Sequence, residues 1–299
     1  MPLGLDTQLK ACSVLVKSYA KINLFLKIIG KTQINNISYH LLQSRFMRVS
    51  SLFDTLGFNF NAKEFTLIGD FDCSLEKNTI YKAFIALLPY VSKTQAKVLN
   101  RTQIVVQKKI PSGGGLGGGS SNAARFLQVV NRELNLGLNQ KMLAEIGAKV
   151  GSDVPFFMSD LELADVEGRG EIVTPSVESK FNVEIINPKV HSSTAEVFKM
   201  YAREFYRADA IPQIKAESWL QKSNAEILSN DAFRNNDLLK PLLSLHPELE
   251  SYCQKGVFLS GSGSCFWRKC EQTESGIAQE NTKDASDSLR QKNENCCNK

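Results

Sequence analysis

A glycine-rich segment near the middle of the chain constrains the fold more than any other feature. Six of the seven residues from Gly113 to Gly119 are glycine, and the β-branched run from Ile104 to Val106 before them predicts a strand. A helix is expected directly after the segment, and its buried face is formed by Ala123, Leu127, Val130 and Leu134. The N–H groups of such a loop can converge on an anion, toward which the positive end of the helix dipole points. This order of elements predicts a cradle for phosphate.

Three other interpretations of the segment fit the sequence less well. A flexible linker is rarely enclosed between a β-branched strand and an amphipathic helix. Gly113, Gly115 and Gly118 form a GxGxxG pattern, but the acidic residue of a dinucleotide fold would then fall near Leu134 to Leu138, at the end of a helix. The Walker pattern is absent because no lysine follows the glycines. If this segment binds a nucleotide, it therefore does so as a third kind of loop.

Composition narrows the class of protein. With 299 residues, 42 % hydrophobic and 22 % charged, the chain can build a large core without disulfide bonds or metal. Its net charge of +5 is spread along the sequence, which argues against nucleic-acid binding and suits phosphorylated substrates. Seven irregularly spaced cysteines and three histidines argue against a metal site and fit free thiols. No apolar run or leader predicts a membrane protein, so we expect a cytoplasmic one.

Periodicity and turn residues predict a mixture of strands and helices. Strands are expected at residues 14–29, 41–60, 64–68, 104–106, 183–186 and 257–259. Helices are expected at residues 78–91, 123–134 (with Gly137 as its cap), 140–150, 194–206, 213–229 and 236–252. Residues 30–40 are expected to form a polar loop, and Pro155 to end the helix before it. Residues 271–299 hold too few large apolar side chains to order, so we expect a disordered tail.

A lysine stands out in the first predicted strand. Alternation places Lys21 and Asn23 on one face, and the opposite face holds Ile22, Leu24, Leu26 and Ile28. A lysine at such a position commonly protects an edge strand from aggregation. A functional ammonium is the alternative interpretation.

Four motifs in this chain resemble those of the GHMP kinase superfamily, which phosphorylates small alcohols with ATP. They are AKINL at residues 20–24, the glycine segment from Pro111 to Asn122, GSDVPFF at residues 151–157 and LSGSGSC at residues 259–265. Their order is that of the superfamily, and within it the glycine segment resembles the kinases of 4-diphosphocytidyl-2-C-methyl-D-erythritol. This resemblance implies an α+β fold of two lobes with the active site in the cleft between them. We expect an N-terminal lobe at residues 1–160 and a C-terminal lobe at residues 161–270.

The resemblance also implies roles for individual residues. Lys21 and Asp153 match the catalytic lysine and aspartate. The carboxylate would take a proton from the alcohol, while the ammonium stabilises charge on the reacting oxygens. The ATP-binding residues would be Pro111, Ser112, Gly113, Gly114, Gly115, Leu116, Gly117, Gly118, Gly119, Ser120 and Ser121. ATP is the expected co-substrate and Mg²⁺ its companion ion, with no dedicated protein metal site.

The alcohol substrate would be bound by residues from both lobes. Tyr39 and His40 match a cytosine-binding pair, in which the tyrosine stacks on the base with Phe198 on its other side. The remaining substrate contacts implied are Asn23, Thr194, Gly261, Ser262 and Gly263. The implied reaction transfers the γ-phosphate of ATP to the 2-hydroxyl of 4-diphosphocytidyl-2-C-methyl-D-erythritol in isoprenoid precursor synthesis. The alternatives are a GHMP kinase for homoserine, mevalonate or a sugar, and an inactive binding protein of the same fold. We expect a monomer or a weak homodimer.

Overall fold

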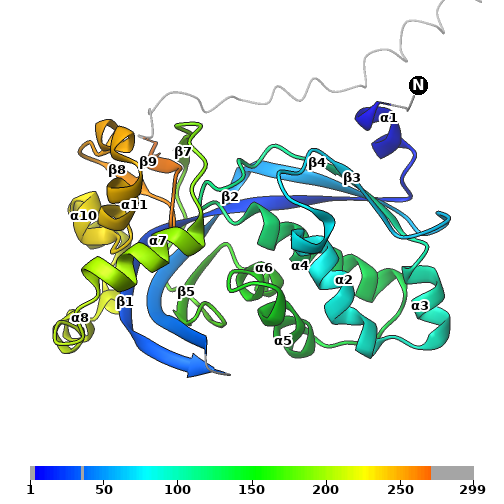
Figure 1. Ribbon diagram of the computed structural model, residues 1–299, viewed down its shortest axis with the longest axis horizontal. Helices are drawn as coiled ribbons and strands as arrows, with labels where there is room; N and C mark the ends of the chain where they lie inside the picture. Colours follow the sequence, from blue (N-terminus) through cyan, green and yellow to red (C-terminus); the bar gives the residue numbers. More distant parts are fainter. Residues whose placement is uncertain (1–3, 35–36, 271–299) are drawn as a thin grey trace, which may run out of the picture.

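The computed structural model describes residues 4–34 and 37–270 and contains two β-sheets, each packed against helices (Figure 1). The strands are β1 (Val14–Ile34), β2 (Ile37–Asn59), β3 (Thr66–Gly69), β4 (Gln103–Gln107), β5 (Leu163–Gly168), β6 (Ile172–Pro175), β7 (Val183–Ile186), β8 (Val257–Leu259) and β9 (Phe266–Lys269). The α-helices are α1 (Leu5–Lys10), α2 (Thr79–Leu87), α3 (Lys93–Leu99), α4 (Gly118–Glu133), α5 (Gln140–Val150), α6 (Val154–Ser159), α7 (Thr194–Met200), α8 (Ile211–Ala216), α9 (Asn224–Ser229), α10 (Ala232–Asn235) and α11 (Leu239–Leu245). The chain therefore has the expected α+β fold.

The two longest strands, β1 and β2, form an antiparallel hairpin that runs through both halves of the molecule (Figure 1). Along its other edge, β2 pairs with β4 near one end and with β5 near the other, which gives the order β3-β4-β2-β5-β6. Strand β1 pairs with β2 alone in this sheet, as expected for an edge strand. Register shifts between Tyr19 and Ala20 and between Asn23 and Phe25 bracket Lys21. Such bulges commonly redirect side chains next to active sites.

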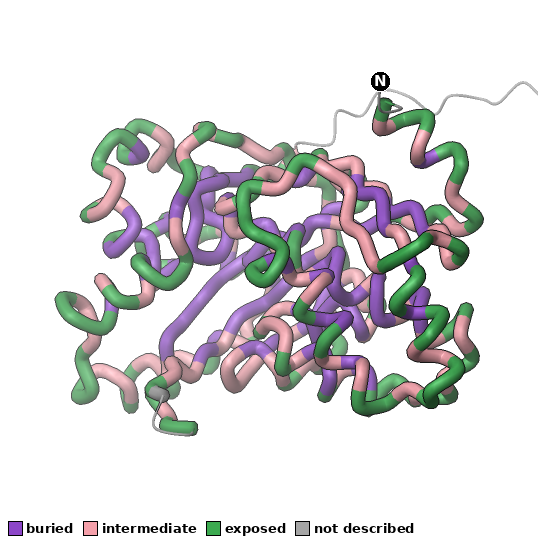
Figure 2. The backbone as a smooth tube through the Cα atoms, turned by 45° about the vertical axis from the view of Figure 1, so that its right-hand side comes forward, coloured by how far each residue is buried: buried purple, intermediate pink, exposed green. Residues whose placement is uncertain are grey.

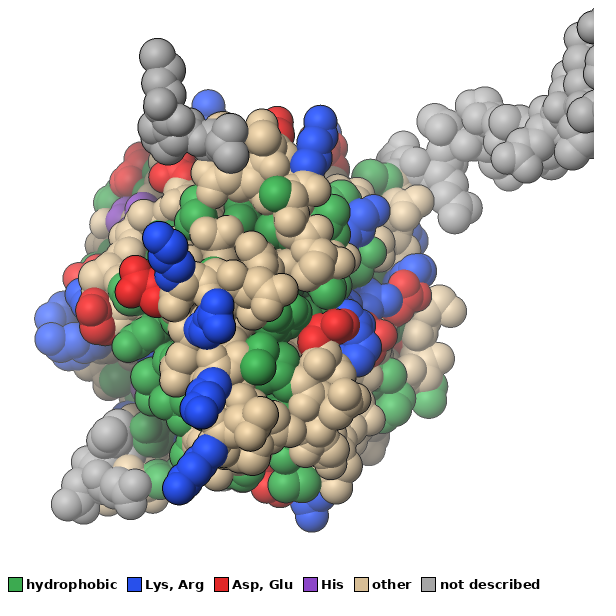
Figure 3. All heavy atoms as spheres, turned by 90° about the vertical axis from the view of Figure 1, so that its right-hand side faces the viewer, with side chains coloured by type: hydrophobic (Ala, Val, Ile, Leu, Met, Phe, Trp, Pro, Cys, Tyr) green, Lys and Arg blue, Asp and Glu red, His purple; other side chains and the backbone are tan. Residues whose placement is uncertain are grey.

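Helices α2, α4, α5 and α6 lie against one face of the first sheet (Figure 1). The hydrophobic alternation of β1 and the apolar stripe of α4 meet there, so the central strands are buried along much of their length (Figure 2). At the α3 end of the molecule, basic and acidic side chains are interspersed among hydrophobic and other groups (Figure 3). The core therefore lies between the sheet and this helical layer.

The second sheet, β7-β9-β8, is small and contacts α10 through β8, whereas α8 and α9 pack against β1. It is tied to the first half through Asp237, whose backbone N–H donates to Leu26 O at 3.0 Å and whose Oδ2 accepts from Ile28 N at 2.8 Å. Arg45, on β2, is only 1 % exposed and donates to Leu220 O at 2.8 Å. The Asp237 bonds occupy the edge of β1 at Leu26 and Ile28, and all three bonds connect the two halves.

Several local predictions are wrong. Residues 30–34 continue β1, and Tyr39 and His40 lie within β2, so the expected polar loop is a hairpin. Helix α4 ends at Glu133, and Asn135 follows with a φ of 48°; Gly137, the expected cap, also has a positive φ of 70° but lies too far beyond the helix end to cap it. Pro155 was expected only to end the helix at residues 140–150. It lies instead in the first turn of a further helix, α6.

The C-terminal half contains shorter helices than the sequence predicts. The stretch 213–229 is divided into α8, a 3₁₀ turn and α9, because Ser218 has a φ of 50° and Ser223 starts a new helix with a capping box. The stretch 236–252 is divided in the same way before Pro247. Strands β5 and β6 extend the first sheet to Pro175, so a lobe boundary at residue 160 stays a prediction. The predicted tail, 271–299, lies outside the described residues.

Candidate active site

A cavity of about 470 Å³ lies between the two halves, directly beside the glycine-rich segment. Residues Pro111 to Ser120 form one wall, and Lys21 and Asn23 of β1 form another. The second half contributes Thr194, Phe198, Gly261 and Ser262. Gly263, Ser121, Tyr39 and His40 are not among the lining residues. The structure therefore brings together most of the predicted site residues, which are far apart in the sequence.

Three backbone carbonyls of the glycine loop accept hydrogen bonds from other segments of the chain. Gly113 O accepts from Ser264 N at 3.0 Å, Gly114 O from Cys265 N at 3.1 Å and Leu116 O from Lys21 N at 2.9 Å. In the described part of the chain, no hydrogen bond is donated by the N–H groups of residues 113–117. The first N–H groups of α4 lack helical partners as at any helix start. The loop thus offers donors for the oxygens of a phosphate chain.

Gly115 shows why this loop requires glycine. Its φ is +73°, and a Cβ added there would lie 1.9 Å from the backbone oxygen of Ser260. The side chain of Ser260 also donates to Gly115 O at 3.0 Å. The second glycine motif, residues 259–265, is therefore in direct contact with the glycine loop. Burial of neighbouring Cys265 raises the pKa of its thiol to about 12, so this side chain packs as a neutral group.

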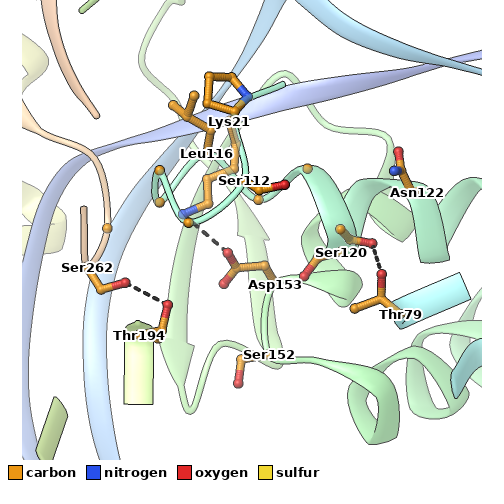
Figure 4. Close-up of a pocket in the computed structure, with 18 of the residues that line it drawn as sticks. Lys21, Thr79, Ser112, Leu116, Ser120, Asn122, Ser152, Asp153, Thr194 and Ser262 are labelled. Atoms are coloured by element: carbon orange, nitrogen blue, oxygen red, sulfur yellow. Dashed lines mark hydrogen bonds and ion pairs between the residues drawn. The ribbon is translucent and has the colours of Figure 1, made fainter. Parts of the chain in front are cut away.

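Lys21 and Asp153 form an ion pair below the loop (Figure 4). Lys21 Nζ lies 3.2 Å from Asp153 Oδ2 and donates to Asn23 Oδ1 at 2.7 Å. It also lies 4.5 Å from the centre of the Phe46 ring. The Lys21 side chain is 3 % exposed and that of Asp153 is 28 % exposed. The edge-strand interpretation of Lys21 is therefore wrong, because its ammonium is buried in the cavity wall.

Asp153 occupies the position before the first residue of α6, yet its side chain makes no capping hydrogen bond. The helix begins with Val154 and Pro155, and a proline at this position is suited to the first turn. The carboxylate instead points toward the Lys21 ammonium (Figure 4). This arrangement leaves one side of the carboxylate open to a ligand in the cavity.

The predicted serines at the start of α4 differ in their surroundings. Ser120 lines the cavity, whereas Ser121 is buried and accepts a hydrogen bond of 2.7 Å from the hydroxyl of Ser18. Across the cavity, the hydroxyls of Thr194 and Ser262 lie 2.8 Å apart (Figure 4). The Asn236 amide donates to Gly261 O at 2.9 Å and holds this glycine motif in place.

The predicted cytosine-binding residues lie at the rim of the site. Adjacent positions on β2 direct Tyr39 and His40 to opposite faces. The His40 ring lies 5.5 Å from that of Phe198 and 5.4 Å from that of Tyr201. Its Nε2 is buried without a partner among the described residues. Burial, and then the nearby Lys31 ammonium, lower the pKa of His40, so its imidazole is neutral at pH 7.

Several cavity residues were not predicted. They include Asn78, Thr79, Lys108, Asn122 and Arg169. Asn78 caps α2, and Thr79 donates to Gly119 O at 2.6 Å, so the start of α2 supports the start of α4. A helix start predicted at residue 78 was the available sequence signal. The described residues contain no cluster of three or more His, Cys, Asp or Glu side chains suited to a metal ion.

Comparison with known proteins gives the class of this chain. Residues 78–160 match the family described as GHMP kinases N terminal domain. A crystal structure of mevalonate kinase shares the fold, with a TM-score of 0.55 and 16 % identity over 87 % of this chain and 92 % of that one. In the described part of the chain, no helix combines the length and apolar character needed to cross a bilayer. The protein is a GHMP-type small-molecule kinase, and such kinases use ATP as co-substrate.

More similar proteins identify the family. The 4-diphosphocytidyl-2-C-methyl-D-erythritol kinase of Sulfurimonas denitrificans is 41 % identical over 265 residues, which cover 86 % of this chain and 97 % of that protein. A crystal structure of 4-(cytidine 5'-diphospho)-2C-methyl-D-erythritol kinase superposes with a TM-score of 0.62 and 26 % identity, covering 86 % of this chain and 90 % of that one. The chain belongs to the 4-diphosphocytidyl-2-C-methyl-D-erythritol kinase family.

Proposed function

We propose that this protein transfers the γ-phosphate of ATP to the 2-hydroxyl of 4-diphosphocytidyl-2-C-methyl-D-erythritol, in the route to isoprenoid precursors. The observation that carries the proposal is the Lys21–Asp153 pair beside a loop of open N–H groups. The family relationship supplies the substrate. Every role assigned to a residue below is part of this proposal.

The transfer begins at the carboxylate of Asp153. It accepts the proton of the substrate hydroxyl as the oxygen attacks the γ-phosphorus, and the bond from that phosphorus to the bridging oxygen of ADP breaks. The Lys21 ammonium, oriented by its hydrogen bond to Asn23, stabilises negative charge on the reacting oxygens. The N–H groups of residues 113–120 bind the phosphate chain and align it with the hydroxyl.

Mg²⁺ fits this site as a companion of ATP. It keeps most of its water ligands and uses only one or two protein groups, so a large protein cluster is not required. Ser120 and Asp153 both line the cavity, and their hydroxyl and carboxylate would hold it. When bound, the ion neutralises charge on the β- and γ-phosphates.

The second half of the cavity would bind the rest of the alcohol substrate. A neutral His40 imidazole with a free Nε2 can exchange a hydrogen bond with cytosine, and Phe198 can pack on the base. Asn23, Thr194 and Ser262 would contact the methylerythritol part. We expect Gly263 to act only through the backbone of its turn, since it does not line the cavity.

We propose a cytoplasmic monomer or weak homodimer that acts on these two small molecules. The five cysteines among the described residues are free thiols, as expected in a reducing compartment.

Release of ADP from MgATP tests the substrate assignment. The panel comprises the diphosphocytidyl alcohol, mevalonate, homoserine and galactose, each at equal concentration. We expect turnover with the first alone. Turnover with another alcohol would support the kinase activity but contradict the proposed cytidine pocket. ATP binding without any turnover would favour an inactive protein.

A further inference from the structure

Arg169 is a cavity residue to which no role has been assigned above. It lies in the turn between β5 and β6 and, like Ser152 and Phe198, lines the cavity. It is the single arginine among the lining residues of the described chain. A guanidinium at this position can bind an anionic group of a ligand in the cavity.

The turn places Arg169 at the substrate end of the cavity. Leu42 of β2 pairs with Gly168, the last residue of β5, so the residues before Leu42 lie beside the turn. The Arg169 guanidinium accordingly lies 5.3 Å from the centre of the Tyr39 ring. This neighbourhood belongs to the alcohol substrate in the proposed function.

Gly170 fixes the turn against the catalytic segment. Its φ is +122°, and a Cβ added there would lie 2.7 Å from the backbone oxygen of Ser152, the residue before Asp153. Figure 4 shows Ser152 on the side of Asp153 that faces away from the glycine loop. Arg169 and the ATP-binding N–H groups therefore approach the reacting centre from different sides.

Glu171 orients the Arg169 guanidinium and leaves its terminal nitrogens available to a ligand. Glu171 accepts from Arg169 Nε at 3.3 Å and from the Arg169 backbone N–H at 2.5 Å. In the described chain, the terminal nitrogens Nη1 and Nη2 make no hydrogen bond, and the side chain is 29 % exposed. A guanidinium held in this way presents the paired donors that bind phosphate oxygens.

We propose that Arg169 forms a subsite for the diphosphate group of the alcohol substrate and so selects a nucleoside diphosphate over an uncharged nucleoside. This inference rests on the proposed function. Within the substrate, the diphosphate joins the cytidine to the methylerythritol, so it lies between the base site and Asp153. Besides Lys21, the lysines that line the cavity are Lys77 and Lys108, which belong to the wall beside the start of α4.

Binding of CDP and of cytidine by calorimetry isolates the diphosphate, because the two ligands differ in that group alone. In the wild-type protein we expect CDP to bind about 10- to 100-fold more tightly than cytidine, as one charge-assisted pair allows. Arg169→Gln should reduce this ratio toward one, while ATP affinity stays within about twofold. Arg169→Lys should retain part of the preference, because it keeps the charge but loses the paired donors.

Arg132→Gln is the matched control. Its Nε also donates to a neighbouring glutamate, Glu133, but it lies outside the cavity. This variant should keep the wild-type ratio, and melting temperatures will show whether each variant is folded.

Two outcomes would overturn the inference alone: an unchanged CDP-to-cytidine ratio in Arg169→Gln, or a loss confined to ATP. Absence of wild-type turnover with the diphosphocytidyl alcohol would instead overturn the proposed function, and the inference with it.

Discussion

The ammonium of Lys21 lies 3.2 Å from the carboxylate of Asp153, although the two residues are 132 positions apart in the sequence. Lys21 lies on β1, and Asp153 is the residue immediately before α6. Lys21 is buried and Asp153 is partly open, so a substrate reaches the carboxylate while the ammonium stays fixed behind it. This asymmetry suits a proton acceptor supported by a fixed charge.

Asp153→Asn tests the proton acceptor. The amide cannot take the hydroxyl proton, so kcat should fall by about 10²- to 10⁴-fold while the dissociation constant for ATP stays nearly constant. Steady-state kinetics and calorimetric titration with ATP measure the two effects. Asp160→Asn is the control, because this residue is 62 % exposed and pairs with Arg48 outside the cavity. A near-normal kcat in Asp153→Asn would show that Asp153 is not the proton acceptor.

Gly115→Ala tests the architecture of the phosphate loop. Its Cβ would displace the Ser260 backbone, so the second glycine motif and the loop must separate and ATP affinity should be lost. Gly137→Ala provides a control with a nearly equal φ of +70° and no atom within 4 Å. That control should cost about 1–2 kcal/mol of stability and leave ATP binding intact. Equal ATP affinities in the two variants would contradict the proposed binding of ATP by this loop.

The pH dependence of stability tests the burial of His40. Its pKa in the folded protein is below the ordinary 6.5, so the unfolded chain binds a proton that the folded chain does not. The free energy of unfolding should therefore fall as pH drops below about 6.5. Urea unfolding at pH 7.5 and 5.5 should show a smaller loss for His40→Gln than for wild type. Parallel losses would show that this imidazole is accessible to protons when folded.

Arg45 tests the connection between the two halves. Its guanidinium pairs with Asp165 at 2.6 Å and donates to Leu220 O, and it is 1 % exposed. Arg45→Met should cost about 3–5 kcal/mol because it leaves buried acceptors unpaired. Arg268→Met removes an exposed pair with Glu184 and should cost at most about 1 kcal/mol. Chemical denaturation measures both values, and similar costs would contradict the difference in burial.

The sequence predicts best where local chemistry decides the structure. The glycine loop, α5 and the alternation of β1 follow from the residues themselves, and the four ordered motifs contain Lys21 and Asp153, which the structure brings into contact. Pairing between distant segments is harder to predict. β5 contains Asp165 and Glu167, and its strand character depends on β2, whose Arg45 neutralises Asp165.

The rim of the site shows the same limitation. The expected placing of Tyr39 and Phe198 on opposite sides of one base stays a prediction, and the sequence did not predict that the His40 ring lies 5.5 Å from that of Phe198 or that Arg169 lies over Tyr39. Arg169 carried no sequence signal, because its place in the cavity depends on a turn packed against Ser152. Such contacts follow from tertiary packing rather than from any local pattern.

Identification of the reaction product tests the central claim most directly. Wild-type protein is incubated with MgATP and 4-diphosphocytidyl-2-C-methyl-D-erythritol, and the phosphorus resonances are followed by NMR. The account predicts one new phosphate monoester on the 2-hydroxyl, formed in equal amount to ADP and absent with Asp153→Asn. ADP formation without this monoester, or a monoester on another hydroxyl, would contradict it.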